Sequence, residues 1–247
     1  MKFAVITDIH GNAPALKAVL EEIDKKQDVE HIFCLGDMIA IGPNTNEVLH
    51  ILFSRANVSM VTGNHDEAVL TLIREEEYPV SHRHVKEHHF WIAERMDRSF
   101  VPKLELLPRT IRKNVAGDSI LFTHYHIESS KLNEHISRDP FSPIVQPSLS
   151  NLEALFADCN AKLICFGHHH PTHYFKGEKT IFLNPGSLGC NNKPIARYAI
   201  VSVEHNHIEI SLEEVVYDNS SFLLSYGQLQ VPDRDFILQT FHGGQLK

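Results

Sequence analysis

The sequence has few of the features that mark secreted, membrane-spanning or nucleic-acid-binding proteins. It holds only four cysteines in 247 residues, and none form a CxxC pair, so neither a disulfide framework nor a cysteine-type zinc site is expected. No apolar run approaches the roughly 20 residues that span a bilayer, and no signal peptide is recognisable. The net charge is -8, which argues against nucleic acid as a partner. We therefore expect a cytoplasmic protein with no membrane partner.

Histidine, in contrast, is abundant, with 18 in the chain. Four of them fall within the nine residues "CFGHHHPTH", from Cys165 to His173. Such a density invites a search for a metal site. The tract either binds metal by itself or forms one corner of a site that distant residues complete.

Hydrophobic periodicity over the first 64 residues alternates between strand and helix. The segments "KFAVITD", "HIFCLGD" and "VSMVTGN" are apolar runs typical of buried parallel strands. Between them, residues 10–26 and 45–55 have helical spacing, and Pro14 suits a first helical turn. This βαβαβ order predicts a parallel sheet with right-handed crossovers and hence the α/β class.

The rest of the chain predicts a charged helical segment and then more strands. Residues 66–109 are helical in pattern, and "TIRKNV" and "SILFTH" suggest a hairpin through a Gly-Asp turn. After a proline-rich loop, a short helix capped by Ser150 precedes the strand "KLICFGH", and residues 173–186 and 197–215 alternate like antiparallel strands. Without a composition break, we expect one domain over 1–247 with a helical insertion at about 66–109. That insertion could form a lid over the site or a dimer surface, so a homo-oligomer is one alternative.

Polar side chains follow five of these strands at the point where each strand ends. In open α/β sheets, ligands bind outside the carboxyl ends of the strands, so we expect these side chains to converge. Five such coincidences are far less expected by chance than one. The set comprises Asp8 and His10, Asp37, Asn64 with His65 and Asp66, His124, and His168 with His170.

The chemistry of this set favours a metal centre. Carboxylate, amide and imidazole groups without thiolate suit Mn, Fe, Co, Ni or Zn. Asp37 stands alone on its strand, and its two oxygens can bridge two cations. Two cations about 3.5–4 Å apart can clamp a phosphoryl group and lower the pKa of a bridging water. The residues therefore predict phosphoryl-transfer chemistry at two metals.

In order along the chain, five motifs resemble those of the calcineurin-like metallophosphoesterases. They are Asp8-x-His10, Gly36-Asp37, Gly63-Asn64-His65-Asp66, His124 and Gly167-His168-x-His170. The segments "DIHGNAPALKAVL", "LGDMIAIGPNTNEV", "GNHDEAV" and "NPGSLG" are similar to the small bacterial and archaeal phosphodiesterase branch, over residues 1 to about 200. The resemblance implies a four-layer αββα sandwich of two mixed sheets with a dinuclear metal centre between them.

The resemblance also implies a role for each residue. One metal would be held by Asp8, His10, Asp37 and His170. The other would be held by Asp37, Asn64, His124 and His168. His65 would reach the substrate and protonate the leaving oxygen or stabilise charge there, which suits a group that titrates near neutrality. Asp66 would either orient His65 or cap the helix that follows.

Several positions depart from the family pattern or stay open. Tyr125 and His126 follow His124 where many relatives have glycine, and His169 stands where many have threonine. We expect these residues at the mouth of the site, with Tyr125 and His126 as candidate substrate-binding residues. The turn "NPGS", residues 184–187, is open to a backbone contact near the metals. The group His82, His84, His88 and His89 favours an exposed helical face over an adventitious metal site.

The leading hypothesis is a phosphodiesterase that acts on a small phosphodiester or nucleotide through a hydroxide bridging two metals. One alternative is a hydrolase of dinucleoside polyphosphates, of the diadenosine tetraphosphate type. Another is a non-catalytic, protein-binding scaffold of the same fold, like the retromer subunit. That subunit lacks the histidine of the Gly-Asn-His motif, whereas His65 is present here. A nuclease would fit the net negative charge less well. A protein Ser/Thr phosphatase is disfavoured because this sequence lacks the arginine that such enzymes carry shortly after the Gly-Asp motif.

Overall fold

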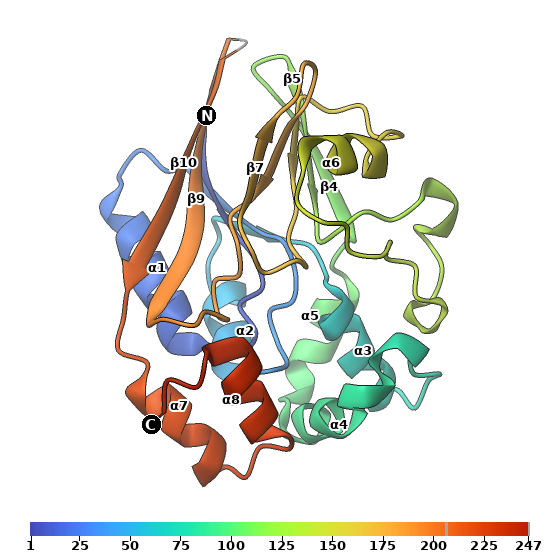
Figure 1. Cartoon of the computed structure of the whole chain (residues 1–247), viewed down its shortest axis with the longest axis vertical. Coiled ribbons are helices and arrows are strands. Elements are labelled where there is room, and N and C mark those ends of the chain that lie inside the picture. The colour runs from blue at the N-terminus through green and yellow to red at the C-terminus, as the bar shows by residue number, and fades with distance from the viewer. Residues whose placement is uncertain (206, 247) are drawn as a thin grey trace.

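Two five-stranded mixed sheets lie face to face in the computed structural model, which describes residues 1–205 and 207–246 (Figure 1). The first sheet has the order β10 (His207–Val216), β9 (Ile195–Glu204), β1 (Lys2–Ile6), β2 (His31–Cys34) and β3 (Val58–Met60). The second has the order β4 (Thr110–Val115), β5 (Asp118–Thr123), β6 (Leu163–Cys165), β8 (Ile181–Asn184) and β7 (His173–Lys176). The predicted α/β class with two mixed sheets is confirmed.

Apolar side chains from both sheets fill the space between them. The rings of Phe33 and Phe122, one from each sheet, stack with centroids 3.7 Å apart, and Phe3 meets both edge-on. All three are fully buried, and burying a side chain of this size contributes about 1.5–3 kcal/mol. β1 and β2 pair in parallel, as do β2 and β3, so their carboxyl ends emerge at one edge of this core.

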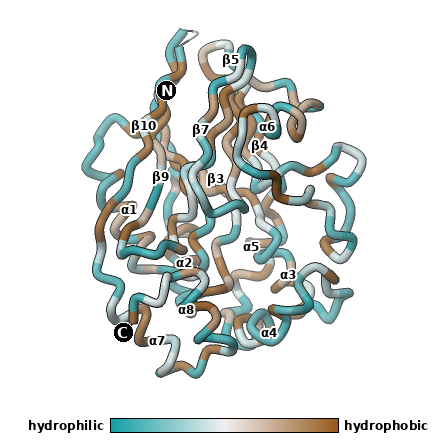
Figure 2. Tube along the Cα trace, in the orientation of Figure 1, coloured by the Kyte–Doolittle hydropathy of each residue, from teal (hydrophilic) through white to brown (hydrophobic). Residues whose placement is uncertain are grey.

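Helices cover the outer face of each sheet and complete the four layers. α1 (Ala13–Lys25) and α2 (Thr45–Phe53) pack on the first sheet, and α6 (Leu149–Leu155) packs on the second. Asn12 caps α1 by accepting a hydrogen bond from Ala15 N at 3.1 Å, and Pro14 lies in the first turn as predicted. Figure 2 shows hydrophilic and hydrophobic residues mixed along α1 and α4, as expected for helices with one face in water.

The segment after β3 forms a run of helices below the sheets in the view of Figure 1. It consists of α3 (Asn64–Ile73), α4 (Lys86–Arg95) and α5 (Val101–Glu105), with 3₁₀ turns η1 (Val80–Val85) and η2 (Arg98–Phe100) between them. The last thirty residues, which the sequence left unplaced, form α7 (Ser220–Gln228) and α8 (Arg234–His242). Two further 3₁₀ turns are η3 (Ser129–Lys131) and η4 (Ile136–Arg138). No helix in the described ranges has the length and apolar character needed to cross a bilayer.

Three local predictions need correction or comment. The cap of α6 is Ser148 and not Ser150, because Ser148 accepts the hydrogen bond from Asn151 N. The hairpin between β4 and β5 turns at Ala116 and Gly117, both with positive φ, so the predicted Gly-Asp turn is displaced by one residue. Asn206, inside the segment predicted as an antiparallel pair, lies outside the described residues.

Candidate metal centre

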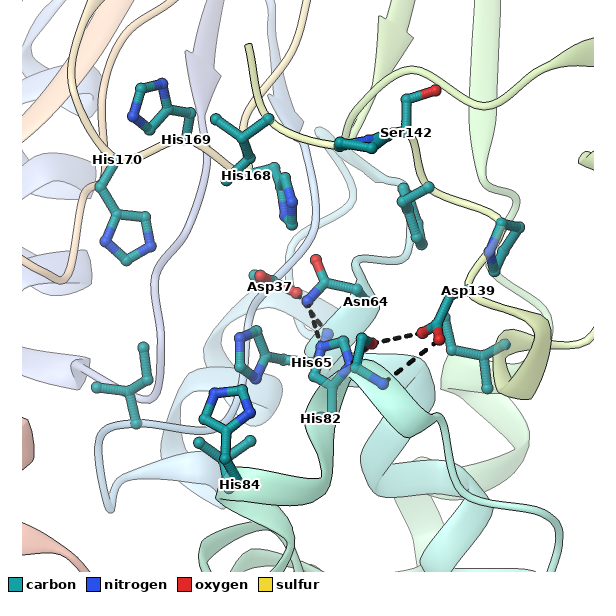
Figure 3. Close-up of a pocket in the computed structure, with 18 of the residues that line it drawn as sticks. Asp37, Asn64, His65, His82, His84, Asp139, Ser142, His168, His169 and His170 are labelled. Carbon is teal, nitrogen blue, oxygen red and sulfur yellow. Dashed lines mark hydrogen bonds between the residues drawn. The ribbon is translucent and has the colours of Figure 1, made fainter. Parts of the chain in front are cut away.

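The carboxyl ends of β1, β2, β3, β5 and β6 meet at one edge of the two sheets and bring together all seven predicted ligands. Figure 3 shows Asp37, Asn64 and His65 lying together, with His168 and His170 on a loop that faces them. The side chains of Asp8, His10, Asp37, Asn64 and His124 are almost completely buried. Residues separated by up to about 160 positions therefore share one small volume.

Tight backbone turns aim these side chains inward. Asp8, His10, Asp37 and His168 all have positive φ, between 48° and 67°. A non-glycine residue in this region costs of order 1–3 kcal/mol, and such strain clusters at functional sites. Asp8 Oδ2 holds the last of these turns, because it accepts a hydrogen bond from His168 N at 3.0 Å. These strained turns bring four of the predicted ligands to the same sheet edge.

The first set of donor atoms comes from Asp8, His10, Asp37 and His170. His10 Nδ1 faces the carbonyl oxygen of Ile39 at 3.3 Å, so it carries the proton and leaves Nε2 as a lone pair. That Nε2 lies 3.1 Å from His170 Nε2, 3.7 Å from Asp8 Oδ1 and 3.8 Å from Asp37 Oδ2. Asp8 Oδ1 is buried and has no hydrogen-bond partner among the described residues. A buried carboxylate oxygen without a partner is costly unless a cation satisfies it.

The second set comes from Asp37, Asn64, His124 and His168. His124 Nδ1 donates to Leu35 O at 2.7 Å, so the neutral ring also presents an Nε2 lone pair. Around that nitrogen lie Asn64 Oδ1 at 2.9 Å, His168 Nδ1 at 3.2 Å and Asp37 Oδ2 at 3.2 Å. Asp37 Oδ2 therefore belongs to both sets. Its other oxygen, Oδ1, accepts a hydrogen bond from His65 N at 2.9 Å.

The electrostatics of both sets call for positive charge. Burial tends to lower the pKa of His124, but the Asp37 carboxylate outweighs it and raises the pKa to about 9. Burial tends to raise the pKa of Asp37, but His124 and other imidazoles hold it well below its usual range. Burial raises the pKa of Asp8. A proton on His124 or a bound cation can supply this charge, so the donor atoms fit divalent metal ions.

Two glycines beside the ligands are required by space. A Cβ on Gly63 would lie 2.2 Å from Asp37 Oδ1, and a Cβ on Gly167 would lie 1.9 Å from Thr7 Oγ1 and 2.7 Å from Asp8 Oδ2. Side chains cannot approach so closely without displacing the ligand. Both glycines therefore let the backbone of one strand end pass directly beside a carboxylate that another strand provides.

The "NPGS" turn supports the ligand loops from behind through backbone contacts. Ser187 Oγ donates to Asp8 O at 2.8 Å, and Ser187 N donates to His170 O at 2.9 Å. Asn184 Nδ2 donates to the carbonyl oxygens of Gly167 and His169, at 3.3 and 2.6 Å. The turn thus links the first ligand loop to the last.

His65 and Asp66 take different positions. His65 lies in the cavity wall, and its Nδ1 is 2.8 Å from His89 Nε2. Asp66 Oδ1 accepts from Met38 N and Ile39 N, and its Oδ2 accepts from Gly63 N, all within 3.2 Å. Of the two roles expected for Asp66, these contacts match the helix cap, and the ring of His65 is held by His89 instead.

The predicted position of Tyr125 and His126 at the mouth of the site is wrong. Tyr125 is fully buried against the second sheet, and its Oη accepts from Val145 N at 3.1 Å. His126 is nearly buried and contacts Ser142 Oγ at 2.8 Å and Asp158 Oδ1 at 3.1 Å. Both lie behind the loop of residues 141–145, part of which lines the cavity. The ring of Tyr125 packs against that of His168, with centroids 5.0 Å apart, and neither Tyr125 nor His126 lines the cavity.

Several residues near the site carry no motif and were missed. His88 and His89 are buried, so the predicted exposed face is wrong for them, while His82 and His84 line the cavity. The density of histidines between 82 and 89 was the available signal, although it does not show that His82 and His89 reach the motif residues. Phe241 of α8 also lines the cavity, with its ring 5.7 Å from that of His170. His169 lines the mouth as expected, and its Nδ1 contacts His173 Nε2 at 2.9 Å.

The donor atoms open onto a cavity of about 890 Å³ (Figure 3). This volume suits a small organic ligand. The loop after η4 forms a largely apolar part of the lining, while η1 contributes His82 and His84 and α8 contributes Phe241. The apolar lining residues are Ile41, Val85, Ile136, Pro140, Phe141, Pro143, Ile144, Pro171 and Phe241.

Comparison with known proteins agrees with this geometry. The sequence profile of the calcineurin-like phosphoesterase superfamily domain matches residues 1–206. An uncharacterised protein of Methanocaldococcus jannaschii is 27% identical over 221 residues, which are 87% of this chain and 87% of that protein. The crystal structure of a metallophosphoesterase from Sphaerobacter thermophilus has the same fold, with a TM-score of 0.71 and 20% identity over 98% of each chain. A symmetrical bis(5'-nucleosyl)-tetraphosphatase of Erwinia tasmaniensis is 33% identical over only 73 residues, 29% of this chain and 27% of that enzyme.

Proposed function

The chain belongs to the calcineurin-like phosphoesterase superfamily and hydrolyses phosphoric esters, and we propose that its substrates are small phosphodiesters cleaved at a two-metal centre. The first metal would be held by Asp8, His10, Asp37 and His170, and the second by Asp37, Asn64, His124 and His168. Mn, Fe, Co, Ni and Zn all suit this donor chemistry. The two overlapping donor sets around Asp37 Oδ2 support the metal assignment.

The charge around the cavity is the observation that favours a diester. Apart from histidines, the described residues that line the cavity include three acidic side chains, Asp37, Glu128 and Asp139, and one basic side chain, Lys131. Lys131 Nζ lies 2.8 Å from Glu128 Oε1, so its charge is already balanced. A phosphodiester brings one negative charge, which the metals can offset. A dinucleoside tetraphosphate brings about four, and the lining offers little to offset the others.

The apolar wall supports the same choice. A phosphodiester has an organic group on both sides of its phosphorus, and the residues around Phe141 offer an apolar surface close to the donor atoms. Burying such a group contributes about 25 cal/mol per Å² of apolar surface.

The chain's own residues position the reaction. When bound, the metals would stabilise charge on the phosphoryl oxygens and make water acidic enough to act as a nucleophile. His65 N donates to Asp37 Oδ1, which fixes the distance between His65 and the bridging carboxylate. His65 Nδ1 is held by His89, so Nε2 is the nitrogen that can take up a proton from solvent, to form the imidazolium, and deliver it to the departing oxygen. Asp66 holds this loop by accepting from Gly63 N.

A substrate comparison tests the proposal directly. Protein reconstituted in turn with Mn, Fe, Co, Ni and Zn would be assayed with bis(4-nitrophenyl) phosphate, 4-nitrophenyl phosphate and diadenosine tetraphosphate. We expect the diester to have the highest kcat/KM, by at least about 10-fold, since it carries the lowest charge. A higher value for the tetraphosphate would support the polyphosphate hydrolase instead. Hydrolysis of none would support the protein-binding scaffold.

A charge variant tests the reason for that preference. Glu128→Gln frees Lys131 and should raise kcat/KM for diadenosine tetraphosphate relative to the diester, by an amount that salt reduces. The pair Glu22–Lys25 on α1 has the same three-residue spacing, so Glu22→Gln is the matched control and should change neither rate. Equal effects of Glu128→Gln on both substrates would show that charge does not select them.

A further inference from the structure

Two histidines of the helical segment that follows the Gly63-Asn64-His65-Asp66 motif contact residues of that motif. His82 Nε2 lies 2.8 Å from Asn64 Nδ2, and His89 Nε2 lies 2.8 Å from His65 Nδ1. Asn64 belongs to the second donor set, and His65 is the proposed proton donor. Two consecutive site residues are therefore each held by a histidine that belongs to neither donor set.

The hydrogen bonds around Tyr78 determine where the protons lie. Tyr78 Oη has one hydrogen, which it donates to His82 O at 3.1 Å. The 2.8 Å contact between Tyr78 Oη and His89 Nδ1 is therefore donated by His89. Burial keeps the pKa of His89 well below its usual range, so its Nε2 is an acceptor. His65 Nδ1 must then donate to that acceptor, which leaves Nε2 as the ring nitrogen of His65 that His89 does not contact.

A second chain of contacts orients the amide of Asn64. Because His82 Nε2 accepts from Asn64 Nδ2, the Asn64 oxygen is the atom that faces His124, at 2.9 Å. His82 Nδ1 donates to Ser81 Oγ at 2.7 Å, and Ser81 Oγ donates to Asp139. If the amide were turned over, its NH₂ group would face the donor set, where it could not bind a cation.

Ordinary core packing is the competing explanation, because buried histidines also occur without a function. His88, directly before His89 in α4, is an example on the same helix. It is buried as well, and its ring stacks on Trp91 with centroids 6.3 Å apart. A substitution at His88 removes a comparable buried ring without touching Asn64 or His65. It is therefore the matched control for the folding cost of removing His89.

We propose that His82 and His89 are positioning residues: His82 fixes the amide of Asn64 for metal binding, and His89 fixes the ring of His65 for proton transfer to the leaving oxygen. The second half rests on the proposed function, whereas the first concerns metal affinity alone. The helical insertion is then part of the active site, since it sets the orientation of two of its residues.

Nitrogen chemical shifts of the histidine rings test the proton arrangement without a substrate. Two-bond ¹H–¹⁵N spectra of the protein loaded with diamagnetic Zn²⁺ should show His65 and His89 in the Nδ1–H form, with signals assigned from His65→Asn and His89→Gln spectra. Tyr78→Phe removes the acceptor of His89 and should give a mixture of its two tautomers. A neutral His65 that carries its proton on Nε2 would overturn the proposal.

A series of diesters tests the role of His89, because a poor leaving group needs a proton and nitrophenol does not. His89→Leu should lower kcat for alkyl diesters by about 100-fold and for bis(4-nitrophenyl) phosphate by less than about threefold. His89→Gln supplies an oxygen acceptor for His65 and should restore most of the loss. His88→Leu should not change the ratio of the two rates. Equal slowing of all diesters, or no rescue by glutamine, would overturn this half of the proposal.

Metal affinity tests the role of His82. Calorimetric titration with Mn²⁺ should show one of two sites weakened by about 10–100-fold in His82→Leu, as for other residues that orient a metal ligand. His82→Gln keeps an acceptor for Asn64 Nδ2 and should bind nearly as the parent does. Unchanged affinity in His82→Leu would overturn this half. If the parent cleaves no diester, the proposed function fails, but the spectra and titrations still decide the positions of His65 and Asn64.

Discussion

Replacing Gly63 with alanine should cost the protein its metals while leaving most of its fold intact. A Cβ at this position would lie 2.2 Å from Asp37 Oδ1 and 2.3 Å from Asp37 N, where ordinary contact begins at 3.4 Å. One of the two residues must therefore move by about 1 Å, whereas metal–ligand distances tolerate about 0.2 Å. Because Asp37 Oδ2 belongs to both donor sets, the displacement would disturb both proposed metal sites.

We expect Gly63→Ala to weaken binding at both sites by at least about 10–100-fold. Overpacking should also lower the free energy of unfolding by about 1–3 kcal/mol, or about 2–4 °C in Tm for each kcal/mol. Mn²⁺ calorimetry and thermal unfolding measure the two effects. Gly227→Ala in α7 is the control, because a Cβ there meets nothing within 4 Å, and it should leave metal binding unchanged. Parental affinity for two metals in Gly63→Ala would refute the role given to Asp37.

Two further predictions concern stability. Burial lowers and Asp37 raises the pKa of His124, to about 9 overall, so chelator-treated protein gains stability from this proton below pH 6.5 and loses it as pH rises toward 9. The denaturant concentration at its unfolding midpoint should fall across that pH range. A midpoint that stays flat or rises would contradict the pairing of His124 with Asp37. At the start of α6, Ser148→Ala should cost about 1 kcal/mol, because Ser148 Oγ accepts from Asn151 N at 3.2 Å. Ser150→Ala should lower the free energy of unfolding far less. Chemical denaturation of both variants measures the difference, and equal effects would contradict the assignment of Ser148 as the cap.

The sequence predicted the strands and the convergence of the candidate ligands together, because both follow from one regularity. Apolar runs mark buried strands, and polar residues directly after them fall at one sheet edge whatever the exact register. Asp8, Asp37 and His124 were recognisable for this reason, although they lie far apart in sequence. Their convergence needs no knowledge of how the two sheets are oriented in detail.

Residues that act from outside the motifs could not be found in the same way. His82 and His89 reach the site only because a 3₁₀ turn and α4 fold back over α3, a tertiary arrangement that periodicity does not encode. Tyr125 and His126 follow a ligand in sequence, but the chain turns them toward the second sheet. Proximity to a motif therefore predicted their neighbourhood and not the direction of their side chains.

The central claim is that Asp37 joins two metals, and electron paramagnetic resonance of Mn²⁺-loaded protein tests it most directly. We expect two Mn²⁺ per chain with the spectrum of an exchange-coupled pair, because Asp37 Oδ2 lies within reach of both His10 and His124. His170→Ala should leave one uncoupled ion, and Asp37→Asn should abolish the coupling. A parent protein that binds one Mn²⁺ per chain with an uncoupled six-line signal would contradict the account.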